Sequence, residues 1–166
     1  RGIGMTLGLY AGSFDPITKG HIDIVQRAAS IAGKLVLAVF DTPSKGLTFS
    51  TNERLQLCKN AVAGMKNVEV TKFDGLLVEF AKSIGADFMI RGLRNLIDLD
   101  YEVAMLMMNR KLNPGIDTIF LYTSQEYQSI SSSLIKEVAS FGGDITDLVT
   151  KDVAQALKSK LGVKAK

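Results

Sequence analysis

The 166-residue chain has one cysteine, one histidine, three prolines and no tryptophan. A single cysteine, Cys58, cannot form an internal disulfide, which excludes a disulfide-stapled fold. Its neighbours at helical spacing, Leu55 and Val62, predict a buried structural thiol rather than a nucleophile. Aromatic residues make up only 7% of the chain and do not alternate with basic ones, so a base-stacking surface for nucleic acid is not expected.

Long apolar runs and strong charge are also missing. No segment approaches the roughly 18 consecutive apolar residues of a membrane-spanning helix, and no signal-peptide pattern is present. We therefore expect a cytoplasmic protein without membrane contact. The net charge of +3 suits an anionic ligand but is too weak to indicate nucleic acid. Because no Cys, His or carboxylate cluster has metal-site spacing, we expect no metal held by protein side chains.

Short apolar runs alternate with helical patterns along the chain. Strands are predicted at 7–11, 35–40, 68–73, 87–90 and 118–122, and helices at 19–32, 51–63, 76–84, 96–112, 132–141 and 151–161. This alternation predicts a single-domain Rossmann-like α/β fold over residues 5–161, a doubly wound parallel five-stranded sheet with helices on both faces. Residues 1–4, ahead of Met5, are interpreted as a cloning remnant or an alternative start.

The only histidine, His21, ends the segment Gly12–His21, where the first predicted strand passes into a helix. Ligands of open α/β sheets bind beyond the carboxyl ends of the strands, and helix N-termini favour anions. A histidine at this position can donate a hydrogen bond to a phosphate. The alternative is a histidine that only caps or packs against the helix.

The loops after the other predicted strands carry further phosphate-compatible donors. They are Lys45, Arg91 and Arg94, and the serines at 129 and 131–133. No nucleophile–base pair accompanies them, so the set suits a polyphosphate ligand and a charge-stabilised transfer reaction. Lys45 alone could be a solvated surface lysine, and the serine run could simply cap a helix.

Two well-known phosphate motifs are absent: the chain has neither G-x-x-x-x-G-K-[ST] nor G-x-G-x-x-G after a strand. This argues against a P-loop NTPase and against an NAD-binding Rossmann protein. We expect Mg²⁺ to arrive on substrate phosphates, because that ion is often bound through them with few protein ligands. Glu102 is interpreted as a surface charge, an acceptor for a ribose hydroxyl, or an acceptor for a basic partner.

The predicted helix 96–112 has two apolar stripes, which predicts burial on two sides. One side would meet the sheet and the other a second subunit, with flexible methionines filling the contact; the alternative is a fully internal helix. The stripes are Tyr101, Ala104, Met105, Met108 and Leu112, and Leu99, Val103 and Leu106.

Several motifs together resemble a known family. Gly12-Ser13-Phe14-Asp15-Pro16 followed by Thr18-x-Gly20-His21 resembles the nucleotidyltransferase superfamily with its [HT]-x-G-H motif, and Ile130–Ser133 resembles its second phosphate-binding motif. Further segments are similar to the bacterial phosphopantetheine adenylyltransferases. They are Pro43-Ser44-Lys45, Ile90-Arg91-Gly92-Leu93-Arg94, Asp100-Tyr101-Glu102 and Met108-Asn109-Arg110.

The resemblance implies transfer of the adenylyl group of ATP to 4′-phosphopantetheine, giving dephospho-CoA and pyrophosphate. It implies that His21 stabilises the transition state and that the protein is a homohexamer, with CoA as a feedback ligand. The implied ATP-binding residues are Ser13, Phe14, His21, Gly92, Leu93, Arg94, Glu102, Tyr127, Gln128, Ser129, Ile130, Ser131, Ser132 and Ser133. The implied phosphopantetheine-binding residues are Ser13, Lys45, Leu77 and Arg91.

The departures from the family pattern are conservative. Ser13 replaces a common threonine and keeps the hydroxyl, Tyr127 stands where tryptophan or tyrosine is common, and Leu77 replaces a frequent methionine. Two alternatives stay open at this point. One is a nucleotidyltransferase with another acceptor, such as nicotinamide mononucleotide or a phospho-alcohol taking CTP, and the other is a catalytically silent nucleotide sensor.

Overall fold

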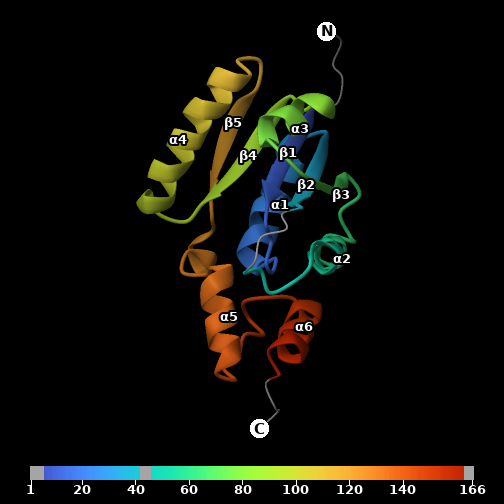
Figure 1. The fold of residues 1–166 in the computed structure, drawn as a ribbon, viewed down its shortest axis with the longest axis vertical. Coiled ribbons are helices and arrows are strands. Elements are labelled where there is room, and N and C mark those ends of the chain that lie inside the picture. The colour runs from blue at the N-terminus through green and yellow to red at the C-terminus, as the bar shows by residue number, and fades with distance from the viewer. Residues whose placement is uncertain (1–5, 42–45, 163–166) are drawn as a thin grey trace.

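The computed structural model describes residues 6–41 and 46–162. Within them, five parallel strands form one sheet: β1 (Leu7–Gly12), β2 (Lys34–Phe40), β3 (Val68–Phe73), β4 (Phe88–Leu93) and β5 (Asp117–Tyr122). The helices are α1 (Lys19–Ile31), α2 (Thr51–Ala61), α3 (Leu77–Ser83), α4 (Leu96–Leu112), α5 (Ser132–Ser140) and α6 (Lys151–Leu161) (Figure 1). A short 3₁₀ turn, Gln125–Tyr127, precedes α5. The predicted Rossmann-like α/β class is confirmed.

The strand order is β3-β2-β1-β4-β5, so the chain winds outward from β1 in both directions. Tyr10 of β1 lies opposite Leu37 of β2 and Ile90 of β4. The winding changes direction between β1 and β4, which makes their carboxyl ends the expected place for a ligand.

Helices cover both faces of the sheet, as the alternating pattern predicts. On one face, Tyr10, Leu37 and Ile90 pack in a single apolar cluster with residues of α1, α2, α5 and α6. On the other face, Leu9 and Met89 pack with α3 residues. In Figure 1, α5 and α6 lie past the carboxyl ends of the strands, where they close that end of the molecule.

The predicted end of the fourth strand at Ile90 is wrong. β4 continues through Arg91 and Gly92 to Leu93, which pairs with Tyr122 of β5. The charged residue and the glycine interrupt the apolar run, but backbone pairing with β5 holds them in the strand. The fit at Gly92 is also tight, because a Cβ there would lie 3.1 Å from the Ile24 side chain of α1 and that side chain would have to shift by a few tenths of an ångström.

The predicted two-sided burial of α4 is not found within the chain. Only Glu102 is buried on this helix, while Ile97 and Met107 are 82% and 61% exposed. The less exposed side carries Glu102, Leu106 and Asn109, which share one face at helical spacing. The helix is therefore not internal, and many of its apolar side chains point away from the sheet.

Cys58 is buried in the first cluster, as predicted. Burial raises the pKa of its thiol to about 12, so it is protonated and unreactive at neutral pH. None of the helices that the structure describes has the length and apolar character needed to cross a membrane.

Candidate active site

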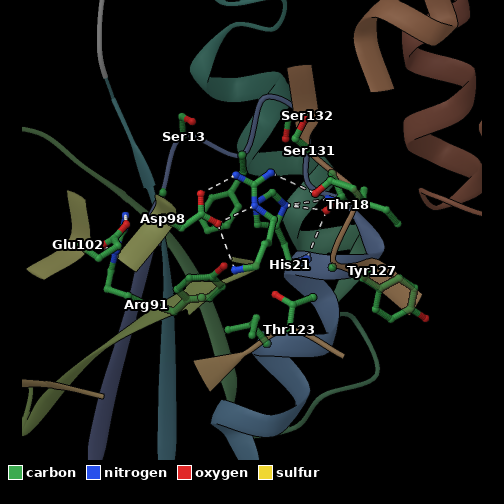
Figure 2. Close-up of a pocket in the computed structure, with 18 of the residues that line it drawn as sticks. Ser13, Thr18, His21, Arg91, Asp98, Glu102, Thr123, Tyr127, Ser131 and Ser132 are labelled. Carbon is green, nitrogen blue, oxygen red and sulfur yellow. Dashed lines mark hydrogen bonds and ion pairs between the residues drawn. The ribbon is translucent and has the colours of Figure 1, made fainter. Parts of the chain in front are cut away.

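A cavity of about 500 Å³ lies at the carboxyl ends of β1 and β4 (Figure 2). Its size is in the range typical of small-molecule sites. The loop after β1, the start of α1, the end of β4, the start of α4 and the start of α5 all contribute to it. The predicted site residues in its lining are Ser13, Phe14, His21, Arg91, Gly92, Arg94, Glu102, Tyr127, Ile130, Ser131, Ser132 and Ser133.

His21 is both a cap of α1 and part of the cavity lining. Thr18 is the N-cap residue, and its hydroxyl oxygen accepts from the His21 backbone N–H at 3.3 Å. In return, the Thr18 backbone N–H donates to Nδ1 of the imidazole at 3.0 Å. This is a capping box in which histidine takes the position usually held by Glu or Gln. The spacing Thr18-x-x-His21 thus follows from how the helix begins.

The capping box sets the chemical state of the imidazole. Because Nδ1 accepts a hydrogen bond, the neutral ring carries its proton on Nε2, which is left to face a ligand. Burial, together with the positive charges of Arg94 and Arg91, lowers the pKa of His21 from 6.5 to about 4. The ring is therefore a neutral hydrogen-bond donor at physiological pH.

The Phe14 ring packs against the imidazole of His21. The contact is edge-on, with 5.2 Å between centroids, and the same ring packs against Tyr10 at 5.5 Å. The Phe14 backbone φ of +47° is unusual for a residue with a side chain. Gly12 makes room for this ring, because a Cβ at position 12 would lie 3.0 Å from it.

Arg91 and Glu102 form a bidentate ion pair at the wall of the cavity. Nε donates to Oε2 at 2.7 Å and Nη2 to Oε1 at 2.5 Å, while Nη1 donates to the Ala11 carbonyl at 2.9 Å. Burial works against the charged guanidinium, but the Glu102 carboxylate outweighs it and raises the pKa of Arg91. Of the three interpretations of Glu102, the structure shows the acceptor for a basic partner.

Arg94 is held in a similar way. Its Nε and Nη2 each donate to the Asp98 carboxylate at 3.0 Å, and Nη1 donates to the Ile130 carbonyl at 3.3 Å. Burial alone would raise the pKa of Asp98, but these hydrogen bonds lower it instead. Arg94 therefore links the end of β4 to the loop before α5.

The serines before α5 have structural partners as well as a place in the cavity lining. Ser131 is the N-cap residue, with its hydroxyl accepting from the Leu134 N–H at 3.1 Å, so the capping interpretation is confirmed. The Ser132 hydroxyl donates to the Pro16 carbonyl at 2.8 Å. The α5 N-terminus thus faces the cavity, and its free N–H groups and positive dipole end favour an anion there.

The structure does not place every predicted residue in this cavity. Leu77 lines an adjacent cavity of about 90 Å³, which shares Arg91, Tyr101 and Glu102 with the larger one. Leu93 is buried, and Gln128 and Ser129 lie outside both linings. Lys45 lies outside the described residues, so its predicted role is untested.

Some residues in the lining were not predicted. Thr18 and Asp98 hold the predicted residues His21 and Arg94. Tyr10, inside β1, and Thr123, directly after β5, also contribute to the lining. Thr18 is recognisable as an N-cap. Asp98 lies in the first turn of α4, whereas Arg94 precedes the N-cap Asn95, so the helical i,i+4 rule does not reveal this pair. Within residues 6–41 and 46–162, no group of three His, Cys, Asp or Glu side chains could hold a metal ion.

Comparison with known proteins places this site in a family. The cytidylyltransferase-like family model matches residues 9–138. The phosphopantetheine adenylyltransferase of Caldanaerobacter subterraneus subsp. tengcongensis is 49% identical over 156 residues, covering 94% of this chain and 98% of the relative. That of Lachnoclostridium phytofermentans is 46% identical, covering 94% and 96%.

A solved structure agrees at the level of the fold. The crystal structure of a candidate nicotinate-nucleotide adenylyltransferase from Vibrio parahaemolyticus superimposes with a TM-score of 0.69 at 16% identity, covering 95% of each chain. The extent and identity of the sequence matches settle the family. The chain belongs to the cytidylyltransferase-like family and, within it, to the phosphopantetheine adenylyltransferases.

Proposed function

We propose that this enzyme transfers the adenylyl group of ATP to the phosphate of 4′-phosphopantetheine, giving dephospho-CoA and pyrophosphate. The observation that carries the proposal is the neutral, Nδ1-anchored imidazole of His21 in a cavity with Arg91, Arg94 and the α5 N-terminus. Relatives at 45–49% identity that bear this activity in their names support the choice of acceptor. A nicotinamide mononucleotide or phospho-alcohol acceptor has no comparable support.

The chemistry needs placement and charge stabilisation more than proton transfer. A phosphate oxygen of the acceptor attacks the α-phosphorus of ATP, and the bond from that phosphorus to the β-phosphate oxygen breaks. The nucleophile is already an anion, so a strong general base is unnecessary. The His21 Nε2–H donates to an α-phosphoryl oxygen, whose negative charge the site must stabilise in the transition state.

The two cavities suggest how the substrates divide the site. We place the ATP phosphates in the larger cavity, near Arg94 and the α5 N-terminus. The pantetheine arm enters the smaller cavity beside Leu77, with its phosphate at Arg91, where the two cavities meet. His21 then lies on the nucleotide side of the bond that forms. CoA carries the same pantetheine arm, so it would compete for the smaller cavity.

We assign Mg²⁺ to the substrate phosphates. The two carboxylates in the lining, Asp98 and Glu102, are each engaged by an arginine, so neither is a free metal ligand. An ion coordinated by ATP phosphates and water fits a site whose protein groups are hydrogen-bond donors and cations. When bound, it would neutralise charge on the departing pyrophosphate.

Product analysis with several acceptors tests the proposal. The purified enzyme is incubated with Mg²⁺ and one substrate pair at a time: ATP with 4′-phosphopantetheine, ATP with nicotinamide mononucleotide, or CTP with phosphocholine. We expect pyrophosphate and dephospho-CoA in equal amounts with the first acceptor. Pyrophosphate release with another acceptor only would contradict the assignment of the acceptor. Release with none would favour the silent nucleotide sensor.

We also propose that the outward face of α4 packs against other copies of the chain in a homohexamer. Tyr101, Met107 and Met108 are 66%, 61% and 53% exposed in the single chain. Clustered exposed apolar side chains of this kind mark protein interfaces.

The cytoplasmic location of the protein remains a prediction from the sequence.

Light scattering tests the assembly. The wild-type protein should have about six times the chain mass of 18.0 kDa. Met107→Lys should reduce the assembly, because it places a charge in the apolar contact. Ile31→Lys is the matched control, since Ile31 is also exposed, at 51%, but lies on α1. A monomeric wild-type protein, or equal loss of assembly in both variants, would contradict the α4 interface.

A further inference from the structure

Arg54, in the first turns of α2, is a buried cation that neither cavity uses. Its exposure is 0%, and it is the largest fully buried side chain in the described part of the molecule. A buried guanidinium is costly unless its donors are satisfied. The hydrogen-bond partners of Arg54 therefore indicate which parts of the chain it holds in place.

The Arg54 guanidinium is anchored mainly by backbone carbonyls. Nη1 donates to the Ser13 oxygen at 2.6 Å and to the Phe40 oxygen at 2.9 Å, and Nε donates to the Phe49 oxygen at 3.3 Å. Nη2 donates to the Thr51 hydroxyl at 3.0 Å, which donates in turn to the Asp41 carboxylate at 2.7 Å. The Thr51 hydroxyl thus bridges the Arg54 guanidinium and the Asp41 carboxylate. Among the described residues, no carboxylate forms a direct ion pair with Arg54.

The contact with Ser13 reaches the reacting centre. The Ser13 carbonyl belongs to the same peptide group as the Phe14 N–H, so a charged donor on its oxygen polarises that N–H and fixes the plane of the peptide. This is the backbone that adopts φ +47° at Phe14, whose ring packs against His21. A chain of contacts through Ser13 and Phe14 therefore links Arg54 to His21.

The other two carbonyls belong to a second loop. Phe40 ends β2 and Phe49 precedes α2, so the same guanidinium holds both ends of the connection between these elements. Asp15 adds a second link, because its carboxylate accepts from the Thr48 and Phe49 N–H groups at 2.9 Å and from Lys136 at 2.8 Å. The β1–α1 loop and the β2–α2 connection are thereby fixed to each other.

We infer that Arg54 is a positioning residue for adenylyl transfer: it fixes the Ser13–Phe14 peptide, and through it His21, in the geometry of the transition state. This inference rests on the proposed function. A residue that only maintained the fold would affect the amount of folded enzyme. A positioning residue instead lowers the turnover of each folded molecule.

Three variants remove the hydrogen bonds of Arg54 in steps. Thr51→Val removes the partner of Nη2 together with the bond from that hydroxyl to Asp41. Arg54→Lys keeps the charge but offers a compact donor group that cannot span three carbonyls, and Arg54→Met removes every donor. The matched control is Leu157→Ala, which creates a cavity in the same apolar cluster but changes a residue of α6 that donates or accepts none of these hydrogen bonds. Each variant is measured for thermal unfolding, for kcat and KM with ATP and 4′-phosphopantetheine, and for the NMR signal of the single histidine.

We expect kcat to fall in the order Thr51→Val, Arg54→Lys, Arg54→Met, with a loss of roughly 10- to 100-fold for the lysine variant while the KM for ATP changes less. The ligand-free His21 resonance should move in the same order. Leu157→Ala should unfold at a lower temperature, but its folded fraction should keep the wild-type kcat and His21 resonance.

Unchanged kcat and His21 resonance in folded Arg54→Lys would overturn the inference. If both Arg54 variants fail to fold, Thr51→Val decides by the same two readouts. Failure of the proposed function is separately visible, because the wild-type enzyme would then not form dephospho-CoA. The shift of the His21 resonance, which needs no substrate, would still report whether Arg54 positions the ring.

Discussion

Replacing His21 with alanine should lower kcat by about 10²–10³-fold, the usual cost of losing one donor to a developing oxyanion. The affinity for ATP should stay within the same order of magnitude, because the lost hydrogen bond matters most in the transition state. Steady-state kinetics give the first quantity and titration calorimetry with ATP gives the second.

Two further variants separate the donor role from other roles of this residue. His21→Gln keeps an N–H donor near the position of Nε2 but cannot act as an acid or base in this pH range, so it should recover part of the lost kcat. Gln26→Ala is the control on the same helix, because Gln26 is exposed, and its kinetics should match those of the wild type. Near wild-type turnover in His21→Ala would refute the assignment.

Removing Lys45 or Arg91 should weaken the binding of 4′-phosphopantetheine by about 10- to 100-fold, in line with about 1.5–3 kcal/mol for a hydrogen bond to a charged group. ATP binding should weaken less. Lys45→Ala is the simpler test, although Lys45 lies outside the described residues. Calorimetric titration with each ligand in turn measures both effects.

Arg91→Ala requires a stability control, because it leaves the buried Glu102 carboxylate without its partner. Breaking a buried pair from one side can cost about 3–5 kcal/mol. The double variant Arg91→Ala/Glu102→Gln removes the uncompensated charge and should recover much of the stability but not the affinity for phosphopantetheine. Equal losses of affinity for both ligands would contradict the assignment of Arg91 to the acceptor.

The sheet was predictable because its central strands are buried on both faces. The unbroken run Leu35–Phe40 has few alternatives to a buried parallel strand, and it is β2. The capping box at Ser50 and Glu53 likewise fixes the start of α2. The pattern failed at Arg91 and Gly92, where hydrogen bonding to β5 continues the strand without an apolar run.

The topology of the sheet predicted where the site lies, but it did not predict the hydrogen bonds and ion pairs within the site. The rule that ligands bind at strand ends was enough to predict that His21, Arg91 and Ser131 line one cavity. The pairing of Arg91 with Glu102 depends on how α4 lies against β4, which no local pattern encodes. Arg54 looks like an ordinary helical surface residue in the sequence, and only the three converging carbonyls show its role.

The outward apolar face of α4 shows something else that the sequence of one chain cannot predict. Two apolar stripes predict two buried sides, but a pattern cannot say whether another element of the same chain or a second chain covers them. In this chain the face toward the sheet carries Glu102 and Asn109, and Met107 and Met108 are exposed.

The state of the His21 ring is the point on which the proposed mechanism depends, and NMR can observe it directly. Because the chain has one histidine, its ¹H–¹⁵N imidazole signals are free of overlap. With a pKa of about 4, the signals should stay constant from pH 8 to about pH 5, with the proton on Nε2 and Nδ1 unprotonated. A titration midpoint near 6.5, or a proton on Nδ1 of the neutral ring, would contradict the proposal that His21 acts as a neutral Nε2–H donor in adenylyl transfer.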